Sequence, residues 1–205
     1  MKGFIKKVFF FLLPLLIIVA SVNYVGDAAR VFSDGYEVKI AKILEAGKNV
    51  TNVSNYDERI LQKEVVTNLE IAPSILVLGS SRTLMIGKDY FSANEKFRNS
   101  SVSGANIQDL TAIYQMYKGL KLLPKKMIIG FDPWFLNENN NQKRWKSISE
   151  YFNAFHNKPI EKGQSNFINF GKLEQLVSLS YFQSSYKMLP KVLKGETAPI
   201  PTNKE

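Results

Sequence analysis

Apolar residues dominate the start of the chain. Residues 8–20 are apolar without interruption except for Pro14, and no charged residue lies between Lys7 and Asp27. An apolar stretch of this length predicts a helix that spans a lipid bilayer. Beyond it, residues 28–70 are more polar, and their apolar positions recur at helical spacing in two places. This pattern predicts two short amphipathic helices that form a stalk.

The middle of the chain alternates between short apolar runs and one longer amphipathic segment. Residues 75–78 and 127–131 are typical of strands buried on both faces, and residues 99–102 are a third candidate strand. Between residues 99–102 and residues 127–131, the apolar residues of 107–120 recur at helical spacing. This segment follows Asn106, a candidate N-cap. Strand, helix and strand in this order predict an α/β fold with a parallel sheet and a right-handed crossover.

Two further helices are predicted in the last third, over residues 147–155 and 173–189, and the Pro-rich end is expected to be disordered. The predicted organisation therefore has four parts: a cytoplasmic tip with a transmembrane anchor (1–27), a helical stalk (28–72), an α/β domain (73–195) and a disordered tail (196–205).

Charged residues around the first apolar stretch predict its orientation. Lys2, Lys6 and Lys7 precede it, whereas Asp27 and Arg30 cancel each other beyond it. The positive-inside rule then leaves the N-terminus in the cytoplasm and the domain outside it. A cleaved signal peptide is the alternative. Residues 19–24 make a poor cleavage site, so an uncleaved anchor is favoured.

Composition narrows the chemistry that the chain can perform. The 205 residues are 45% hydrophobic and 22% charged, which suits a folded domain. There is no Cys, which excludes thiolate nucleophiles and Cys-based metal sites, and the single His excludes a two-His metal centre. We expect no metal and no cofactor. The net charge of the chain is +9, but the sequence contains no recognised nucleic-acid-binding motif. Lipid headgroups or an anionic glycopolymer are therefore the expected partners, and nucleic acid is not.

Three glycine-containing segments follow the predicted strands. They are residues 79–82 (Gly-Ser-Ser-Arg), 103–106 (Ser-Gly-Ala-Asn) and 130–134 (Gly-Phe-Asp-Pro-Trp). The carboxyl ends of parallel strands meet at one edge of a sheet, where ligands bind, so these segments are expected to converge there. Ser81 is then a candidate nucleophile at a strand-to-helix turn, and the alternative is that Ser80 and Ser81 are ordinary turn or capping residues.

These three segments resemble the sequence blocks of the SGNH/GDSL hydrolase family. Residues 79–81 stand where that family has Gly-Asp-Ser, residues 99–104 resemble its second block, and residues 130–132 resemble its third block, Gly-x-Asn. The resemblance implies a flavodoxin-like parallel sheet with flanking helices. It implies that Ser81 is the nucleophile, with the backbone N–H groups of Ser81 and Gly104 in the oxyanion hole.

The Gly-Ser-Ser variant with a single N-terminal anchor is most similar to bacterial envelope proteins that move acyl groups on polymers, as in D-alanyl-lipoteichoic acid synthesis and alginate acetylation. The resemblance implies a single-pass protein of the bacterial cytoplasmic membrane with an extracytoplasmic domain. Its expected activity is that of an esterase or O-acyltransferase on an envelope polysaccharide, and an acyl-donor membrane protein is a further expected partner.

Two positions depart from the family's pattern. Asp132 stands where the family has Asn, and an ionised carboxylate accepts hydrogen bonds but donates none. Either Arg82 substitutes as the donor, or Asp132 has another role such as holding Arg82, or acyl transfer is weak. The family's closing D-x-x-H block is missing as well. His156 has the spacing but lacks the Asp, so it is either the base or an ordinary surface or rim residue. We expect instead that the base lies in a C-terminal part of the domain that this sequence does not contain.

The candidate site combines these residues. Ser81, Gly104, Asp132 and His156 are the candidate catalytic residues, and Arg82, Ser80, Asn106 and Trp134 are the candidate substrate-binding residues. The alternative function is a non-catalytic, membrane-anchored binding or assembly protein on a degenerate or truncated fold of this type.

Overall fold

A computed structural model of the chain describes residues 2–33, 35–137, 139–157 and 170–202, and these divide into two units. One unit contains residues up to Lys39, residues 48–56 and the C-terminal helices. The other contains residues 40–47 and 57–161. Helix α2 (Tyr36–Glu45) belongs partly to each. Every candidate site residue lies in the second unit, which holds the parallel sheet.

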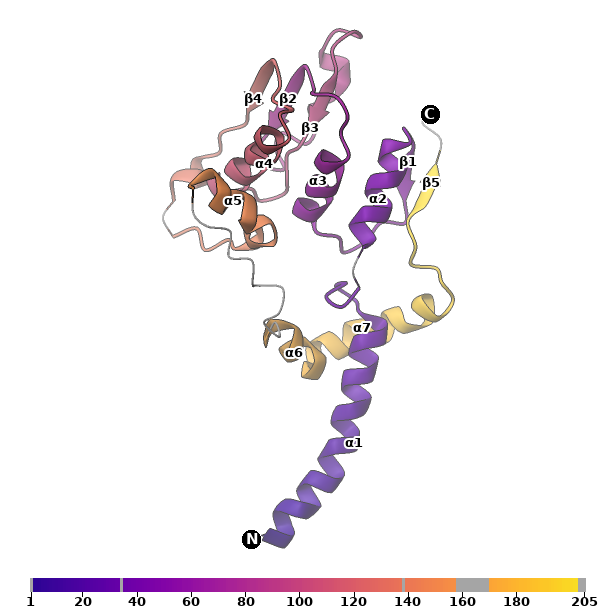
Figure 1. The fold of residues 1–205 in the computed structure, drawn as a ribbon. Coiled ribbons are helices and arrows are strands. Elements are labelled where there is room, and N and C mark those ends of the chain that lie inside the picture. The colour runs from indigo at the N-terminus through magenta and orange to yellow at the C-terminus, as the bar shows by residue number, and fades with distance from the viewer. Residues whose placement is uncertain (1, 34, 138, 158–169, 203–205) are drawn as a thin grey trace. The chain divides into compact units, whose positions relative to one another are not determined.

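Three strands form this sheet: β2 (Ile75–Leu78), β3 (Phe97–Asn99) and β4 (Lys126–Ile129). Their order is β3-β2-β4 and both pairings are parallel, so β2 is the central strand (Figure 1). Leu76 lies opposite Arg98 on one side and Met127 on the other. The predicted α/β fold with a parallel sheet is therefore confirmed.

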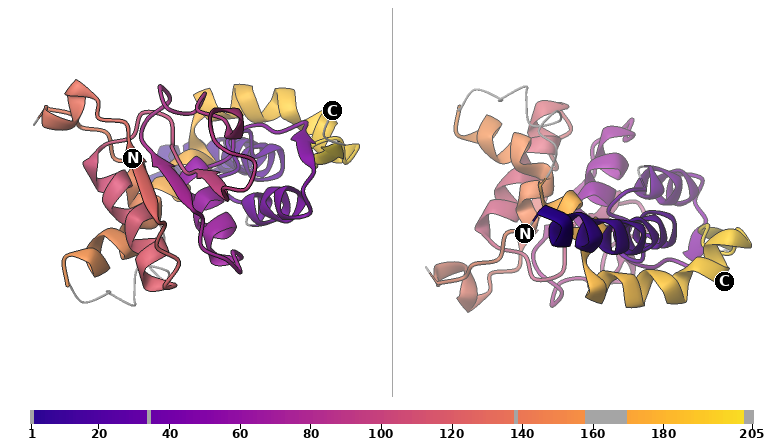
Figure 2. Two further views of the ribbon diagram at one scale, coloured as in Figure 1. Left: turned by 90° about the horizontal axis from the view of Figure 1, so that it is seen from above. Right: turned by 90° about the horizontal axis from the view of Figure 1, so that it is seen from below.

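Helices and short 3₁₀ turns precede, separate and follow the three strands along the chain. They are α3 (Glu58–Thr67), η1 (Lys88–Tyr90), α4 (Ile107–Gly119), η2 (Pro133–Leu136), η3 (Arg144–Ile148) and α5 (Ser149–Phe155). Helix α4 lies beside the strands in Figure 1 and in both views of Figure 2. A continuous apolar core joins Leu76 and Leu78 of β2 to Val66 of α3, Ile113 of α4 and Ile148 of η3.

Local signals in the sequence account for the start of α4. The side chain of Asn106 accepts a hydrogen bond from the backbone N–H of Asp109 (3.0 Å), and the Asp109 carboxylate accepts one from the N–H of Asn106 (3.0 Å). This reciprocal capping box satisfies two N–H groups that a helix start leaves without partners. The predicted N-cap and the predicted helix are confirmed.

Other predicted elements differ from the structure. The second strand begins at Phe97, so residues 100–102 follow it instead of forming it. A series of turns over residues 81–85 follows β2 where a helix was expected. Helix α3, expected in a stalk, contributes Val66 to the core of the sheet unit. Strand β4 was expected to be buried, but its apolar residues are exposed, because the apolar core does not extend over this strand.

The first unit contains α1 (Lys2–Gly26), α6 (Phe170–Val177), α7 (Leu179–Leu193) and a two-stranded antiparallel sheet. The amide of Asn23 donates to the carbonyl oxygens of Gln175, Leu176 and Ser178, at 2.8–3.1 Å. A Cβ on Gly26 would lie 2.2 Å from the carbonyl oxygen of Ser185. The last turn of α1 therefore packs closely against both C-terminal helices.

Strand β1 (Asn49–Thr51) pairs with β5 (Ile200–Thr202) in that two-stranded sheet. The expectation of a disordered tail over 196–205 is therefore wrong for residues 200–202. Backbone pairing with a segment about 150 positions earlier orders these residues, and local composition gives no sign of such a partner.

Among the described residues, no helix combines the length and the apolar character needed to cross a membrane. The expectation of a bilayer-spanning helix over residues 1–27 is therefore not supported.

Candidate functional site

The three predicted loops meet at one edge of the sheet, because the strands that precede them are parallel. Two backbone hydrogen bonds continue the strand pairing into the loops. The N–H of Val102 donates to the carbonyl of Gly79 (3.1 Å), and the N–H of Gly130 donates to the carbonyl of Leu78 (2.8 Å). The sequence prediction that these loops converge is confirmed.

The two adjacent serines of the first loop have opposite surroundings. Ser80 is fully buried, and its hydroxyl accepts a hydrogen bond from the N–H of Arg82 (3.3 Å). The N–H of Thr83 donates to the carbonyl of Ser80 (3.0 Å) and so closes a tight turn. Ser81 lies in this turn and is exposed. Ser81 is therefore the serine that a solute can reach. Ser80, expected to bind substrate, instead supports the turn from beneath.

Thr83 fastens this turn to the other two loops. Its hydroxyl donates to the carbonyl of Ser80 (2.8 Å) and bonds to the Ser101 hydroxyl (2.7 Å). A Cβ on Gly79 would lie 2.4 Å from the Thr83 hydroxyl oxygen, and a Cβ on Gly130 would lie 2.2 Å from its methyl group. The two glycines are needed because the Thr83 side chain fills the space between them. The sequence shows the glycines, but nothing in it identifies Thr83 as their neighbour.

A second clamp holds the turn from the end of β3. The Asn99 amide donates to the carbonyls of Thr83 (2.7 Å) and Ile86 (3.1 Å), and its oxygen accepts from the N–H of Ser101 (3.0 Å). The next residue, Ser100, is buried, and its hydroxyl bonds to the buried Tyr117 hydroxyl (2.8 Å). Burial raises the pKa of Tyr117, so its hydroxyl stays protonated in this bond. The Ser81 turn is thus tied at several points to a rigid core.

Asp132 of the third loop holds Arg82. The carboxylate is buried, with 6% of its side chain exposed, and lies 3.3 Å from a guanidinium nitrogen of Arg82, whose side chain is 67% exposed. The Arg82 guanidinium also lies over the ring of Trp134, 4.8 Å from its centre. The Trp134 ring nitrogen donates to the carbonyl of Ala105 (3.0 Å), which joins the third loop to the second. Of the roles open to Asp132, the contact favours the positioning of Arg82.

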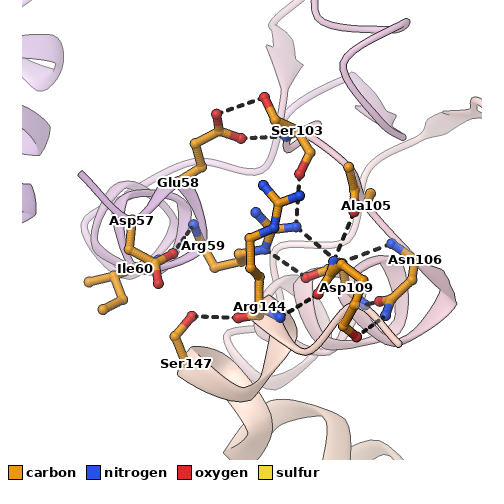
Figure 3. A network of polar contacts seen from close by, with 12 residues as sticks. Asp57, Glu58, Arg59, Ile60, Ser103, Ala105, Asn106, Asp109, Arg144 and Ser147 are labelled. Carbon is orange, nitrogen blue, oxygen red and sulfur yellow. Dashed lines mark hydrogen bonds and ion pairs between the residues drawn. The ribbon is translucent and has the colours of Figure 1, made fainter. Parts of the chain in front are cut away.

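A buried network supports the second loop (Figure 3). Arg59 of α3 pairs with the buried carboxylate of Asp109 (2.9 Å) and donates to the carbonyl of Ser103 (3.0 Å). Glu58 accepts from both the hydroxyl and the N–H of Ser103. Since both partners of the buried ion pair are hydrogen-bonded, the pair fixes α3, α4 and the loop in one arrangement. Asn106 serves this network as the helix cap.

Gly104 lies at the tip of the second loop with φ at +56°, a conformation that favours glycine. Its carbonyl accepts from the side chain of Gln142 (2.8 Å). Among the described residues, neither the N–H of Gly104 nor that of Ser81 donates a hydrogen bond. An oxyanion hole requires N–H groups that are not committed to the protein in this way.

A cleft of about 460 Å³ adjoins Gly104. Gly104, Trp134 and Arg144 line it together with five residues that carry amide side chains, Asn137, Asn139, Asn140, Asn141 and Gln142. A smaller cleft of about 190 Å³ shares Trp134, Asn137 and Asn140 with it and also includes Asn106. Trp134 and Asn106 therefore do line a cavity, as a substrate-binding role requires. Arg144 and Gln142 were not among the predicted site residues, because both stand in a run that reads as an exposed polar loop.

His156 is not brought to this site by any contact in the described chain. It follows the last residue of α5, where its ring packs against Phe152 (4.6 Å between ring centres) and Phe155 (5.3 Å). Neither a hydrogen bond nor a ring contact joins it to Ser81 within the described ranges. In the same residues there is no group of three or more His, Asp or Glu side chains arranged to hold a metal ion.

The chain matches no protein-family model, no curated protein and no solved structure. The geometry of the three loops is thus the basis for any functional conclusion.

Proposed function

We propose that the chain is an SGNH-like esterase or O-acyltransferase that acts on an envelope polysaccharide through an acyl group on Ser81. The observation that carries the proposal is the accessible Ser81 hydroxyl, which lies on a clamped turn beside a second loop whose Gly104 N–H is free. A nucleophile and backbone donors at one sheet edge are two of the parts that acyl transfer requires, and a base is the third.

The proposed reaction has two halves. In the first, the Ser81 oxygen bonds to the carbonyl carbon of an ester, the carbon–oxygen bond to the alcohol breaks, and the alcohol leaves with one proton. In the second, water or a sugar hydroxyl attacks the acyl group and Ser81 regains its proton. A base must hold the proton in between, and an imidazole is the proposed class. Because His156 packs on aromatic rings elsewhere and is the single His of the sequence, we propose that this imidazole is supplied from outside these 205 residues.

The amide-rich cleft supports a polysaccharide as the substrate. Amide groups both donate and accept hydrogen bonds, which matches the hydroxyl groups of a sugar, and the Trp134 ring offers an apolar surface. The net charge of +9 supports an anionic polymer. We also propose an acyl-donor membrane protein as a partner, because the sequence resembles envelope proteins that move acyl groups on polymers.

We also propose that α1 attaches the protein to the bacterial cytoplasmic membrane. The apolar side chains of α1 support this. Phe10 and Phe11 are 75% and 76% exposed, and Ile17 is 57% exposed, so water covers them unless a lipid phase does. Flotation of the full chain with anionic lipid vesicles tests attachment. The chain should float, and F11K/I17K should not; a wild-type chain that stays at the bottom would contradict attachment.

Labelling with an activated fluorophosphonate tests the chemistry. The Ser81 oxygen displaces fluoride from phosphorus and the hydroxyl proton leaves to solvent, so one phosphonyl group is added per chain. We expect peptide mapping to find it on Ser81. Labelling should disappear in S81A and persist in S92A, which removes an exposed hydroxyl elsewhere in the sheet unit.

The second candidate function is a non-catalytic binding or assembly protein. Two observations favour it: Asp132 cannot donate to an oxyanion, and His156 does not contact Ser81. Folded wild-type protein that takes up no fluorophosphonate, yet binds a polysaccharide, would support this function over the first.

A further inference from the structure

The proposed oxyanion hole lacks a side-chain donor. Asp132 occupies the third-loop position, and its carboxylate only accepts hydrogen bonds. Arg82 is the nearest substitute in sequence, but its guanidinium is already paired with Asp132 and lies over Trp134. The charge of Arg82 is thus largely balanced before any substrate arrives. A different donor is needed for the negative charge that develops in acyl transfer.

Arg144 lies directly against Gly104. One guanidinium nitrogen is 2.6 Å, and the guanidinium carbon 3.4 Å, from the point where a Cβ of residue 104 would stand. A side chain at position 104 would displace this guanidinium, and the positive φ of Gly104 favours glycine independently. The Gly104 backbone and the Arg144 guanidinium therefore border the same part of the cleft.

The segment that carries Arg144 is anchored to the second loop through Gln142. The Gln142 amide nitrogen donates to the carbonyl of Gly104 (2.8 Å) and to the carboxylate of Asp109 (3.0 Å), and its oxygen accepts from the N–H of Arg144. Asp109 is itself held by Arg59 (Figure 3). The backbone of Arg144 is thus fixed relative to Gly104 through groups that belong to the buried network.

The charge of Arg144 has no protein partner in the described ranges. Its side chain is exposed and forms no ion pair there, in contrast to Arg59, which Asp109 neutralises, and Arg82, which Asp132 neutralises. Of the three arginines around the site, Arg144 is the one that lines the cleft, and it has no ion pair in the described ranges.

We propose that the Arg144 guanidinium and the N–H of Gly104 together bind the carbonyl oxygen while it carries negative charge. Arg144 thereby supplies the donor that Asp132 cannot supply, and it is a catalytic residue of the reaction proposed above, on which this inference rests. A guanidinium suits the task because it is always charged and presents several donors in a fixed plane.

The rate of fluorophosphonate labelling at Ser81 tests the inference, because the phosphoryl oxygen gains negative charge as the oxygen–phosphorus bond forms and the phosphorus–fluorine bond breaks. R144Q should slow labelling by about 10²–10³-fold. R144K, which keeps the charge but loses the planar fork, should recover part of the loss. K146Q removes a positive charge from the same 3₁₀ turn, η3, and should label at the wild-type rate.

A turnover assay separates catalysis from binding or folding. With p-nitrophenyl acetate, R144Q should lower kcat and leave KM within about twofold, as expected for an interaction made only in the transition state. Because Arg144 is exposed, the thermal midpoint of R144Q should equal that of the wild type. Labelling of R144Q within threefold of wild type, or a change in KM alone, would overturn the role of Arg144 while leaving Ser81 as the nucleophile. An unlabelled wild-type chain would overturn both.

Discussion

Strands β2 and β4 have nearly the same composition and opposite surroundings. Each has four residues, each is mainly aliphatic, and they pair with each other in parallel along their whole length. Every residue of β2 is at most 2% exposed, whereas Met127, Ile128 and Ile129 of β4 are 37–51% exposed. Apolar composition therefore does not decide burial. Residues of α3 and α4 pack on β2, whereas no residue of β4 belongs to that core.

The largest difference between the strands should appear when a side chain of each is truncated. Leu76→Ala should destabilise the sheet unit by about 2–5 kcal/mol, because it leaves a cavity in a closely packed core. Ile128→Ala should cost less than about 1 kcal/mol, since water already reaches this side chain. Urea unfolding of the full chain measures both. Equal costs would show that β4 is buried in solution.

The glycine after β4 tests whether its loop is packed more tightly than the strand itself. Gly130→Ala should destabilise by about 1–3 kcal/mol, because its methyl group would lie 2.2 Å from a carbon of Thr83. It should also slow Ser81 labelling, since Thr83 holds that turn. Gly119→Ala is the control, with no atom within 4 Å of the added carbon, and should be neutral or stabilising. A neutral Gly130→Ala would contradict the packing described here.

The burial of Tyr117 in the core can be tested by the pH dependence of stability. Burial raises its pKa above the ordinary value of 10.0, so the folded state holds the phenolic proton more tightly than the unfolded state does. Its contribution to stability is full below pH 10 and is lost as the pH rises through the higher folded-state pKa. Unfolding free energies from pH 8 to 11 should therefore fall more steeply in wild type than in Tyr117→Phe. Tyr90→Phe, at an exposed position, should behave like wild type.

The smallest effect on stability is expected from a charge on the edge strand. Ile129→Glu should change the unfolding free energy by no more than about 0.5 kcal/mol, because the side chain is half exposed. It should nevertheless reduce self-association, since charged residues on an edge strand oppose pairing with another chain. Sedimentation velocity at several protein concentrations measures this. Strong destabilisation by Ile129→Glu would show that this position is buried in solution.

Sequence patterns predicted the elements whose signals are local. Strand β2 has the predicted ends, and α4 begins at the predicted cap, because four aliphatic residues and an Asn with Asp three positions later carry their own information. The convergence of the three loops followed from parallel pairing alone. The accessibility of Ser81 and the pairing of Arg82 with Asp132 agree with roles considered from the sequence.

Features that depend on distant neighbours could not be predicted in this way. An apolar run does not reveal whether its strand is central or at an edge, so β4 was expected to be buried. Thr83 and Arg144 each lie against a glycine from a distant part of the chain, Gly130 and Gly104 respectively, and no local pattern reveals these contacts. The pairing of residues 49–51 with 200–202 likewise has no local signature.

The contact of Asn23 with the end of α6 has a practical consequence for anyone who designs a shortened, secreted version of this protein. Deletion of residues 1–27 would remove the Asn23 amide that three backbone oxygens share, and it would also remove Asp27, whose carboxylate accepts from the Tyr181 hydroxyl at 2.8 Å. A shortened chain that begins ahead of Asn23 retains both groups, and one that begins after Asp27 should be less stable.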